Sequence, residues 1–352
     1  MSQTTPRTIR WGIIGCGDVC EVKSGPGFQK ADHSELVMVM RRDAAKAQDF
    51  AQRYNVPHWT TDAHELINSP LIDAVYIATP VGTHCSYALQ VAQAGKPCYI
   101  EKPLTRNFAE ATQIVETFAK HNIPVFSAFY RRQLPRFVKA KELIEAGAIG
   151  QVTSLNVLFM SAYHKPNSPL NSRWRVQAQH SGGGLFFDLA SHALDAIDYM
   201  LGPLVDVTGH GANVASEHDV EDIVSLRFNL KNSGAVGTGC WNFASYTHED
   251  QILIHGTQGK ITMACFAHPR LTLINSDGEQ TLNLPDPPHV HQPLIQSIVN
   301  ELNGKGQCPS TAKSAARTTK VMDLATENYY ASRDGNFWES PERWPGRRIK
   351  IK

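Results

Sequence analysis

Asp188 and His192 have side chains suited to proton transfer, and they stand four residues apart directly after the glycine run 182–184. Side chains four residues apart share one face of an α-helix, so a helix here would bring the carboxylate near the imidazole. Histidine titrates near neutral pH and can accept or donate a proton. The pair therefore predicts an acid–base site with His192 as proton carrier. The same spacing is also typical of contacts that only stabilise a helix.

Lys102 stands in the tripeptide Glu101, Lys102, Pro103, immediately after the short apolar run 98–100. A lysine at this place can stabilise negative charge on a substrate oxygen, or it can itself donate the proton. The sequence does not separate these two roles. A lone lysine is usually a solvated surface charge, but the position at the end of a predicted strand in a nucleotide-binding pattern favours a catalytic role.

The glycine turn after the first apolar run has the spacing of a dinucleotide-binding loop. Gly15 and Gly17 fill the first two glycine places of the pattern GxGxxG, and Cys20 occupies the third, where a small residue allows close helix–strand packing. The first glycine permits the tight turn, and the second lets backbone N–H groups approach a pyrophosphate. The residues expected to contact the dinucleotide here are Gly15, Gly17, Asp18 and Val19.

The residues after the second apolar run indicate which dinucleotide is preferred. A carboxylate at this place would hold the ribose 2′-hydroxyl of NAD, but the sequence has Arg41 and Arg42. Guanidinium groups bind phosphate oxygens bidentately, and a 2′-phosphate carries about two negative charges. The two arginines therefore predict a preference for NADP(H), while NAD(H) stays open as a second cofactor.

The nucleotide-binding residues need a parallel sheet to position them, and the first third of the chain has that pattern. Apolar runs alternate with helical segments, as in strands joined by right-handed crossover helices. The expected strands are residues 9–14, 36–40, 74–78, 98–100 and 125–129, and the expected helices are 43–54, 83–94 and 109–120. This is the doubly wound Rossmann arrangement.

The pattern changes after about residue 150. Apolar and polar residues alternate over 220–230, which indicates a strand of an antiparallel sheet with one exposed face, a candidate surface for subunit contact. Further strands are expected at 151–159, 235–241, 251–255 and 271–274, and helices at 188–200, 293–303 and 312–330. The chain is therefore predicted to be an α/β protein with two domains, 1–130 carrying the parallel sheet and 131–352 a mostly antiparallel one.

The composition disfavours several classes of partner and location. Lys and Arg number 34 and Asp and Glu 33, a balance that gives no reason to expect nucleic acid or an anionic membrane as partner. No apolar run reaches the roughly 18 residues of a membrane span, and residues 1–10 lack the apolar core of a signal peptide, so a cytoplasmic location is expected. The seven cysteines are dispersed without CxxC pairs, which favours free thiols and no metal site.

Several further motifs make the chain resemble one enzyme family. They are Glu101-Lys102-Pro103, Ala78-Thr79-Pro80 with His84, Phe129-Tyr130-Arg131-Arg132 with Pro135, Trp174-Arg175, and the triple glycine followed by Asp188, His192 and Asp195. In this order, over nearly the whole chain, the sequence resembles the glucose-fructose oxidoreductase, inositol dehydrogenase and rhizopine catabolism (Gfo/Idh/MocA) family. The resemblance implies an N-terminal Rossmann domain, a second α/β domain with a large open sheet, and a homodimer or homotetramer.

The resemblance also implies roles for the matching residues. Lys102, Asp188 and His192 would form the catalytic set. Besides the glycine turn and the two arginines, the cofactor would contact Thr79, Pro80, His84, Glu101, Lys102, Arg131, Trp174 and Arg175. The substrate would contact Lys102, Arg131, Asp188 and His192. Tyr163, in a proline-containing segment, is expected to border the substrate, whereas His289 and His291 are expected to be ordinary polar residues.

The sequence thus predicts an NAD(P)-dependent oxidoreductase that acts on CH–OH groups of a sugar, cyclitol or polyol-like substrate. Two alternatives stay open, namely an NADPH-dependent reductase of an aldehyde or dicarbonyl compound and a non-catalytic NADP(H)-binding sensor. A metal-dependent hydrolase that uses Asp188 and His192 is disfavoured, because the sequence has no metal-ligand spacing and the glycine turn would stay unexplained.

Overall fold

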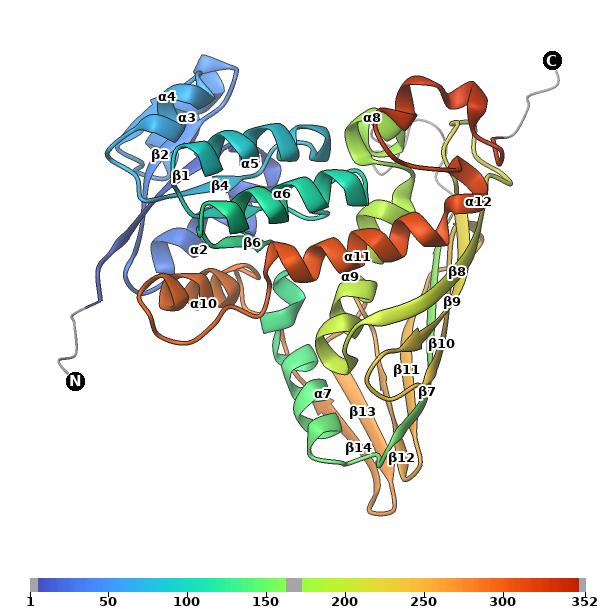
Figure 1. The fold of residues 1–352 in the computed structure, drawn as a ribbon. Coiled ribbons are helices and arrows are strands. Elements are labelled where there is room, and N and C mark those ends of the chain that lie inside the picture. Colours follow the sequence, from blue (N-terminus) through green and yellow to red (C-terminus); the bar gives the residue numbers. More distant parts are fainter. Residues whose placement is uncertain (1–5, 163–172, 348–352) are drawn as a thin grey trace. The chain divides into compact units, whose positions relative to one another are not determined.

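The structure is a computed structural model that describes residues 6–162 and 173–347. Its contacts divide the described residues into two compact units (Figure 1). The first unit takes its residues from Met1–Leu104, Glu110–Leu134 and Pro287–Ala315, and the second from Thr105–Ala109, Pro135–Asp286 and Ala316–Lys352. Both units are discontinuous in sequence, whereas the expected domains 1–130 and 131–352 are single stretches. The domain boundary near residue 130 stays a prediction.

The first unit is built on a parallel sheet with the strand order β3-β2-β1-β4-β5-β6. Its strands are β1 (Ile9–Ile14), β2 (Ser34–Met40), β3 (His58–Thr60), β4 (Ala74–Ile77), β5 (Cys98–Ile100) and β6 (Val125–Ser127). The central strands β4 and β5 are buried along their whole length, as expected for a parallel sheet covered on both faces. The expected Rossmann sheet is therefore confirmed.

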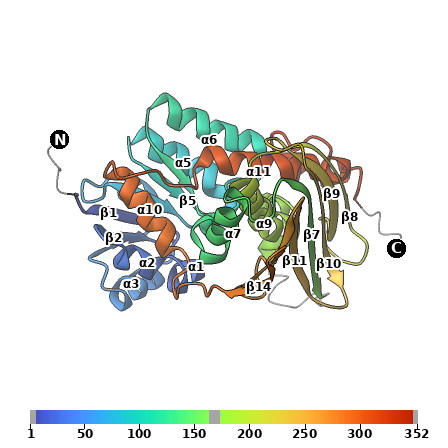
Figure 2. The same cartoon turned by 90° about the horizontal axis from the view of Figure 1, so that it is seen from below.

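Helices cover both faces of this parallel sheet. In Figure 2, α2 (Gly25–Lys30) and α10 (Gln292–Leu302) lie together on one face, and α5 (His84–Gln93) and α6 (Phe108–Lys120) lie on the other. The remaining helices of the unit are α1 (Asp18–Val22), α3 (Ala44–Arg53) and α4 (Ala63–Asn68). Asp43 begins α3, because its side chain accepts a hydrogen bond from the Lys46 backbone N at 3.2 Å.

The second unit is built on a sheet with the order β14-β13-β12-β11-β7-β10-β9-β8, antiparallel except between β7 and β10. Its strands are β7 (Val152–Ala162), β8 (Leu204–Ala212), β9 (Ile223–Leu230), β10 (Val236–Ser245), β11 (Glu249–Gly256), β12 (Gly259–Met263), β13 (Arg270–Asn275) and β14 (Gly278–Asn283). The expected mostly antiparallel sheet is thus confirmed.

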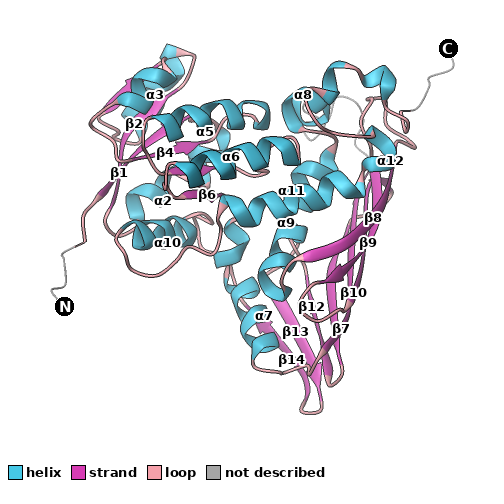
Figure 3. Cartoon of the chain, viewed as in Figure 1, coloured by secondary structure: helices cyan, strands magenta, loops and turns pink. Residues whose placement is uncertain are grey.

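One face of the second sheet is covered and the other is open. Figure 3 shows α7 (Pro135–Glu145) and α9 (Leu185–Leu201) on the covered face, where α9 packs on β9 and β10. The other α-helices of the unit are α8 (Ala178–Ser181), α12 (Glu327–Tyr330) and the part of α11 (Ala312–Ala325) from Ala316 onward. Along β9, Val224, Leu226 and Phe228 are buried, while Ser225 and Arg227 are exposed on the open face. The alternation of apolar and polar residues in the sequence therefore corresponds to the covered and the open face of the sheet.

Among the elements that sequence patterns did not predict, β3 and β14 have weak apolar signals, whereas α4 (Ala63–Asn68), α7 (Pro135–Glu145) and β12 (Gly259–Met263) carry buried apolar residues and were missed all the same. β3 has three residues, of which two are exposed, and β14 is exposed along most of its length. The single helix expected at 312–330 ends at Ala325, and α12 follows after Thr326. Within residues 6–162 and 173–347, no helix is long and apolar enough to cross a membrane.

Candidate active site

The glycine turn is crowded at its first glycine and open at its second. Gly15 has φ +89°, and a Cβ atom there would lie 2.7 Å from Thr79 Cγ2 and 3.0 Å from the Thr79 backbone N, so only glycine fits. A Cβ atom on Gly17 would meet nothing nearer than the Gly15 carbonyl oxygen at 3.9 Å. This open space beside the backbone at the start of α1 fits a dinucleotide pyrophosphate.

Cys20 occupies the third glycine place without disturbing the turn. Its side chain is completely buried, and its backbone N donates to the Gly17 carbonyl at 2.8 Å. Burial raises the pKa of the Cys20 thiol well above its usual value and that of Cys16 to about 11, so both thiols are neutral near pH 7. The turn therefore presents neither a bulky group nor a thiolate to a ligand.

Arg41 directly follows β2 and lies against the glycine turn. Its Nη1 donates to the Cys16 carbonyl oxygen at 3.1 Å, while Arg42 is exposed. The next acidic residue along the chain, Asp43, is engaged at the start of α3. The end of β2 therefore offers the Arg41 guanidinium beside the turn, and its nearest carboxylate in sequence, Asp43, already has a helix-capping partner.

The turn after β4 is fixed by a buried histidine. His84 lies with Nε2 2.8 Å from the Thr79 carbonyl oxygen and Nδ1 3.1 Å from the Leu104 carbonyl oxygen. Burial lowers the pKa of His84, so the imidazole is neutral. His84 joins the turn that contains Thr79 and Pro80 to the segment just after Lys102, so it supports both loops from behind.

A buried carboxyl group lies behind Lys102, which directly follows β5. Glu101 Oε1 accepts a hydrogen bond from the Tyr76 hydroxyl at 2.5 Å, and Oε2 accepts one from the Lys102 backbone N at 3.0 Å. Burial raises the pKa of Glu101 above its usual range. Glu101 thus fixes the backbone from which the Lys102 side chain extends.

His291 completes this network, although no local motif singled it out. Its Nδ1 lies 3.0 Å from the Tyr99 hydroxyl, and its Nε2 lies 3.6 Å from Glu101 Oε1. Burial is the main cause that lowers the pKa of His291, to about 3, so the imidazole is neutral and its contact with Glu101 is not an ion pair. Neighbouring positive charges lower this pKa further: Lys23, Lys102 and Arg131.

Arg131 belongs to the short 3-10 helix η2 (Tyr130–Gln133) of the first unit. Its side chain is buried, and its guanidinium carbon lies 5.1 Å from the centre of the Tyr130 ring. The first unit therefore gathers Gly15, Thr79 and Glu101 at the carboxyl ends of the neighbouring strands β1, β4 and β5. In an open parallel sheet this edge is the usual nucleotide site.

In the second unit, a second buried glutamate holds the start of α9. The Gly184 backbone N lies 2.9 Å from both carboxyl oxygens of Glu221, and a Cβ atom on Gly184 would lie 2.2 Å from the Glu221 carbonyl oxygen. The Tyr330 hydroxyl also donates to Glu221. Burial raises the pKa of Glu221 to about 7. Sequence reasoning missed Glu221, because it is distant in sequence from the glycine run.

Arg333 is a buried cation near the start of α9 and Glu221. Its Nε donates to Asp323 Oδ1 at 2.8 Å, and its Nη2 donates to the carbonyl oxygens of Gly182 and Arg106. The guanidinium carbon also lies 4.0 Å from the centre of the Phe187 ring. Arg333 therefore ties the glycine run and the first turn of α9 to the segment 105–109.

The helix expected from residue 188 is confirmed as part of α9, which contains both Asp188 and His192. Asp188 Oδ2 lies 3.2 Å from Arg175 Nε, and the Arg175 guanidinium lies 4.7 Å from the centre of the Trp174 ring. The second unit therefore brings Trp174, Arg175 and Asp188 together. His192 is buried. Tyr163 lies outside the described residues.

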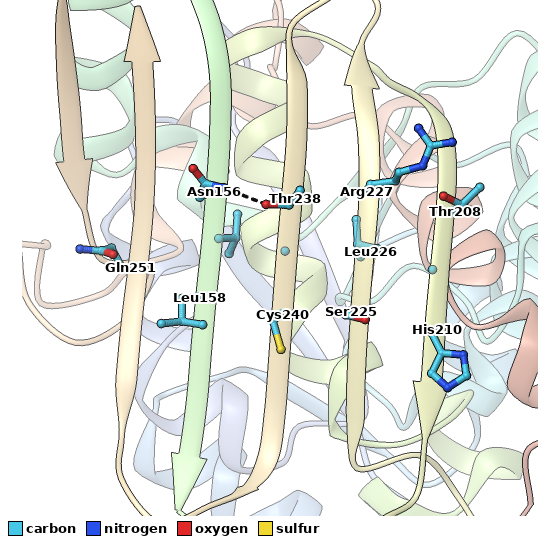
Figure 4. Close-up of a pocket in the computed structure, with 13 residues that line it drawn as sticks. Asn156, Leu158, Thr208, His210, Ser225, Leu226, Arg227, Thr238, Cys240 and Gln251 are labelled. Atoms are coloured by element: carbon cyan, nitrogen blue, oxygen red, sulfur yellow. Dashed lines mark hydrogen bonds between the residues drawn. The ribbon is translucent and has the colours of Figure 1, made fainter.

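A cavity of about 670 Å³ lies on the open face of the second sheet. Figure 4 shows its lining side chains on adjacent strands, with Asn156 Nδ2 donating to Thr238 Oγ1 at 2.8 Å. The cavity contains none of the predicted site residues, and α9 packs on the opposite face of the sheet. Among the described residues, no group of three or more His, Cys, Asp or Glu side chains is arranged to hold a metal ion.

Comparison with known proteins decides the family. Residues 9–129 match an oxidoreductase family with an NAD-binding Rossmann fold, and residues 137–262 match the Gfo/Idh/MocA C-terminal domain. The chain is 38% identical over 322 residues to Oxidoreductase P35 of Formosa agariphila, an alignment that covers 90% of this chain and 98% of that protein. The chain belongs to the Gfo/Idh/MocA family. It is an oxidoreductase with an NAD-binding Rossmann domain, as the motifs predicted.

Other members of the family are similar over most of their length. The scyllo-inositol 2-dehydrogenase (NAD(+)) of Bacillus subtilis is 26% identical over 79% of this chain and 80% of that protein. A solved structure of levoglucosan dehydrogenase, in complex with NADH and levoglucosan, superimposes with a TM-score of 0.79 at 25% identity, covering 90% of this chain and 96% of that chain.

Proposed function

We propose that this protein transfers a hydride between NADP(H), its preferred cofactor, and a carbon of a sugar, cyclitol or polyol-like substrate. The observation that carries the cofactor preference is the Arg41 guanidinium, 3.1 Å from the Cys16 carbonyl of the glycine turn. Relatives named for scyllo-inositol and levoglucosan support a hydroxylated ring as the substrate class. NAD(H) is the weaker cofactor in this proposal, because Asp43 is engaged at α3.

Lys102 and His192 handle the proton and the substrate oxygen in this proposal. A bound nicotinamide would supply the hydride acceptor for oxidation of the alcohol and the hydride donor for reduction of the carbonyl. His192 accepts the hydroxyl proton in the oxidation and returns it in the reduction. The Lys102 ammonium stabilises the negative charge on the oxygen. Asp188, oriented by Arg175, binds a substrate hydroxyl.

The test of the reaction is the change in nicotinamide absorbance with aldoses, ketoses, inositols and dicarbonyl compounds, using both cofactors in both directions. Turnover of hydroxylated rings with NADP(H) is expected. Turnover of dicarbonyl or aldehyde compounds alone would favour the NADPH-dependent reductase. NADPH binding without turnover of any compound would favour the sensor.

The test of cofactor preference is Arg41→Asp, with dissociation constants for NADPH and NADH measured by fluorescence. The change places a carboxylate where the 2′-phosphate would bind, so NADPH affinity is expected to fall at least about tenfold while NADH affinity changes little. Arg270→Asp, an exposed residue of β13 in the second unit, is the matched charge reversal outside the Rossmann unit and should leave both constants unchanged. Equal losses for the two cofactors in Arg41→Asp would contradict the proposal.

We also propose a homodimer or homotetramer in the cytoplasm, formed through the open face of the second sheet. That face carries both apolar and polar side chains, among them Leu158, Cys240 and Arg227 (Figure 4). Light scattering after size exclusion should give a molecular mass that is a multiple of the chain mass. Leu158→Arg should lower the measured mass, because an unpaired charge would be buried in the contact.

A further inference from the structure

Phe266 lies against the His192 ring on the loop between β12 and β13. The two ring centres are 5.6 Å apart, and the planes meet at 85°, an edge-to-face contact. The Phe266 side chain is partly exposed although His192 is buried. The loop thus places a large apolar surface, accessible in part, directly beside the proposed proton carrier.

The backbone of this loop is held by a carboxylate from the neighbouring strand β11. Asp250 Oδ1 accepts a hydrogen bond from the Cys265 backbone N at 2.8 Å, and Oδ2 accepts bonds from the backbone N atoms of Phe266 and Ala267. Three consecutive backbone donors of the loop therefore share one side chain. Such charge-assisted bonds are stronger than bonds between neutral groups.

A buried arginine holds the carbonyl groups of the same loop. Arg136 of α7 is only 2% exposed, and its guanidinium donates to the carbonyl oxygens of Cys265 at 2.8 Å and His268 at 3.2 Å. Asp286 lies 3.6 Å away and partly balances the charge. Burying a guanidinium is unfavourable unless it is paired and hydrogen-bonded, so this loop is positioned more firmly than a surface connection requires.

Phe266 belongs to an aromatic cluster. The Phe159 ring centre, on β7, lies 5.4 Å from that of Phe266 and 5.9 Å from that of Phe243 on β10. Phe243 is buried, whereas Phe159 is partly exposed. The cluster therefore forms an apolar wall that reaches His192 within a single unit of the fold.

We propose that Phe266 is a specificity-determining residue that receives the C–H face of a ring-shaped alcohol, with Asp250 and Arg136 as its positioning residues. The electron-rich face of an aromatic ring attracts the C–H hydrogens on the face of a saturated ring. An open-chain polyol has no fixed face of this kind and loses more conformational entropy on binding. The inference rests on the proposed function through the role given to His192.

The first test compares cyclic probes, scyllo-inositol and levoglucosan, with the open-chain hexitol sorbitol. Phe266→Ala is expected to lower kcat/KM for the cyclic probes by about 10- to 100-fold, the usual effect of removing an apolar contact in a specificity pocket. Phe266→Leu keeps bulk and should lose less. Any turnover of sorbitol should change less than about threefold, and the Kd for NADPH should be unchanged. Trp59→Ala, which removes an exposed aromatic side chain on β3, is the matched control and should match the wild type.

A binding measurement separates this inference from the proposed reaction. Saturation-transfer NMR, with irradiation of the aromatic protons, should show transfer to the ring hydrogens of the cyclic probes in the wild type and a loss of that transfer in Phe266→Leu. If the cyclic probes bind in this way but are not turned over, the proposed function fails and the Phe266 inference stands. Absence of transfer to both cyclic probes in the wild type, or equal transfer in the variant, overturns the inference.

The positioning role of Asp250 has its own readout. Asp250→Asn keeps the shape but weakens the acceptors of three loop N–H groups, so Phe266 is held less firmly. We expect KM for the cyclic probes to rise by at least about threefold with little change in kcat, and the preference for cyclic over open-chain probes to fall. A lower melting temperature with an unchanged preference would assign Asp250 a structural role only and overturn that part of the inference.

Discussion

Each unit of the molecule places a buried glutamate behind the backbone of a proposed catalytic segment. Glu101 accepts a hydrogen bond from the Lys102 backbone N, and Glu221 accepts one from the Gly184 backbone N at the start of α9. A tyrosine hydroxyl donates to each carboxyl group, and burial raises the pKa of both glutamates. These tyrosines are Tyr76 and Tyr330, respectively. Each unit therefore contains a buried glutamate that accepts hydrogen bonds from a backbone N–H and from a tyrosine hydroxyl.

The two regions differ in the group that faces the glutamate. In the first unit it is the neutral imidazole of His291, whose low pKa keeps it uncharged. In the second unit the positive charge of Arg333 acts on Glu221, and Arg333 is itself paired with Asp323. Lys102 and Lys23 also lower the pKa of Glu101, but its buried neighbour His291 is neutral, whereas Glu221 lies beside the buried ion pair of Arg333 and Asp323. The difference predicts that the second region tolerates the loss of its partner less well.

The largest expected effects are on turnover, with one proposed catalytic residue tested in each region. Lys102→Met and His192→Ala should each lower kcat by about 10²- to 10⁴-fold, the usual range for removing a group that stabilises an oxyanion or one that transfers a proton. The Kd for NADPH should stay within about threefold, because the glycine turn and Arg41, which bind the phosphates in this proposal, are unchanged and Lys102 is one of many expected cofactor contacts. Steady-state kinetics and cofactor fluorescence check this. Lys120→Met and His121→Ala, both exposed, are the matched controls. A near-normal rate in either test variant would remove that residue from the mechanism.

The sequence predicted those residues and elements of the two regions whose interacting partners are neighbours along the chain. β5 was predicted with its bounds, because the apolar run 98–100 is enclosed by Pro97 and Glu101. Lys102 and Glu101 were found together for the same reason. A helix was expected over 188–200, and α9 covers this range but begins at Leu185 and ends at Leu201.

The parts that sequence reasoning missed depend on partners distant in the chain. Glu221, His291 and Arg333 each approach their partners only after the chain has folded across a sheet. No periodicity or short motif marks such a residue, because its burial is set by tertiary packing. β14 was missed for the opposite reason, since its mostly exposed residues carry no apolar pattern.

The next largest effect is the loss of stability when the neutral partner His291 or the charged partner Arg333 is removed. Arg333→Met leaves Asp323 without its buried cation and should lower the free energy of unfolding by about 3–5 kcal/mol. His291→Gln removes a neutral group and keeps a hydrogen-bonding side chain, so about 1–2 kcal/mol is expected. Urea unfolding followed by circular dichroism measures both. Equal losses in the two variants would show that the charge of the partner does not distinguish the regions.

The pH dependence of stability isolates the charge on Glu221. Its pKa rises from 4.5 in the unfolded chain to about 7 in the folded one, so the folded state holds the extra proton between these values. Stability from this group is present below pH 4.5 and is lost as pH rises through about 7, by about 3 kcal/mol in total. Glu221→Gln should remove that loss, so the wild-type and variant unfolding curves should diverge between pH 4.5 and 7. Parallel curves across this window would contradict the raised pKa.

The smallest effects are expected from removing the tyrosine hydroxyl that donates to the buried glutamate in each unit. Tyr76→Phe and Tyr330→Phe should each lower the free energy of unfolding by about 1–2 kcal/mol, the range for a buried hydrogen bond whose acceptor is left behind. Both hydroxyls also lower the pKa of the glutamate that they contact, so each variant should raise that pKa further. For Tyr330→Phe, the pH-dependent loss of stability should therefore extend above pH 7. Suppose that Tyr330→Phe shifts the pH-dependent loss of stability but Tyr76→Phe does not lower the free energy of unfolding. Only Glu221 would then depend on its tyrosine, and the two glutamates would share a geometry but not an energetic role.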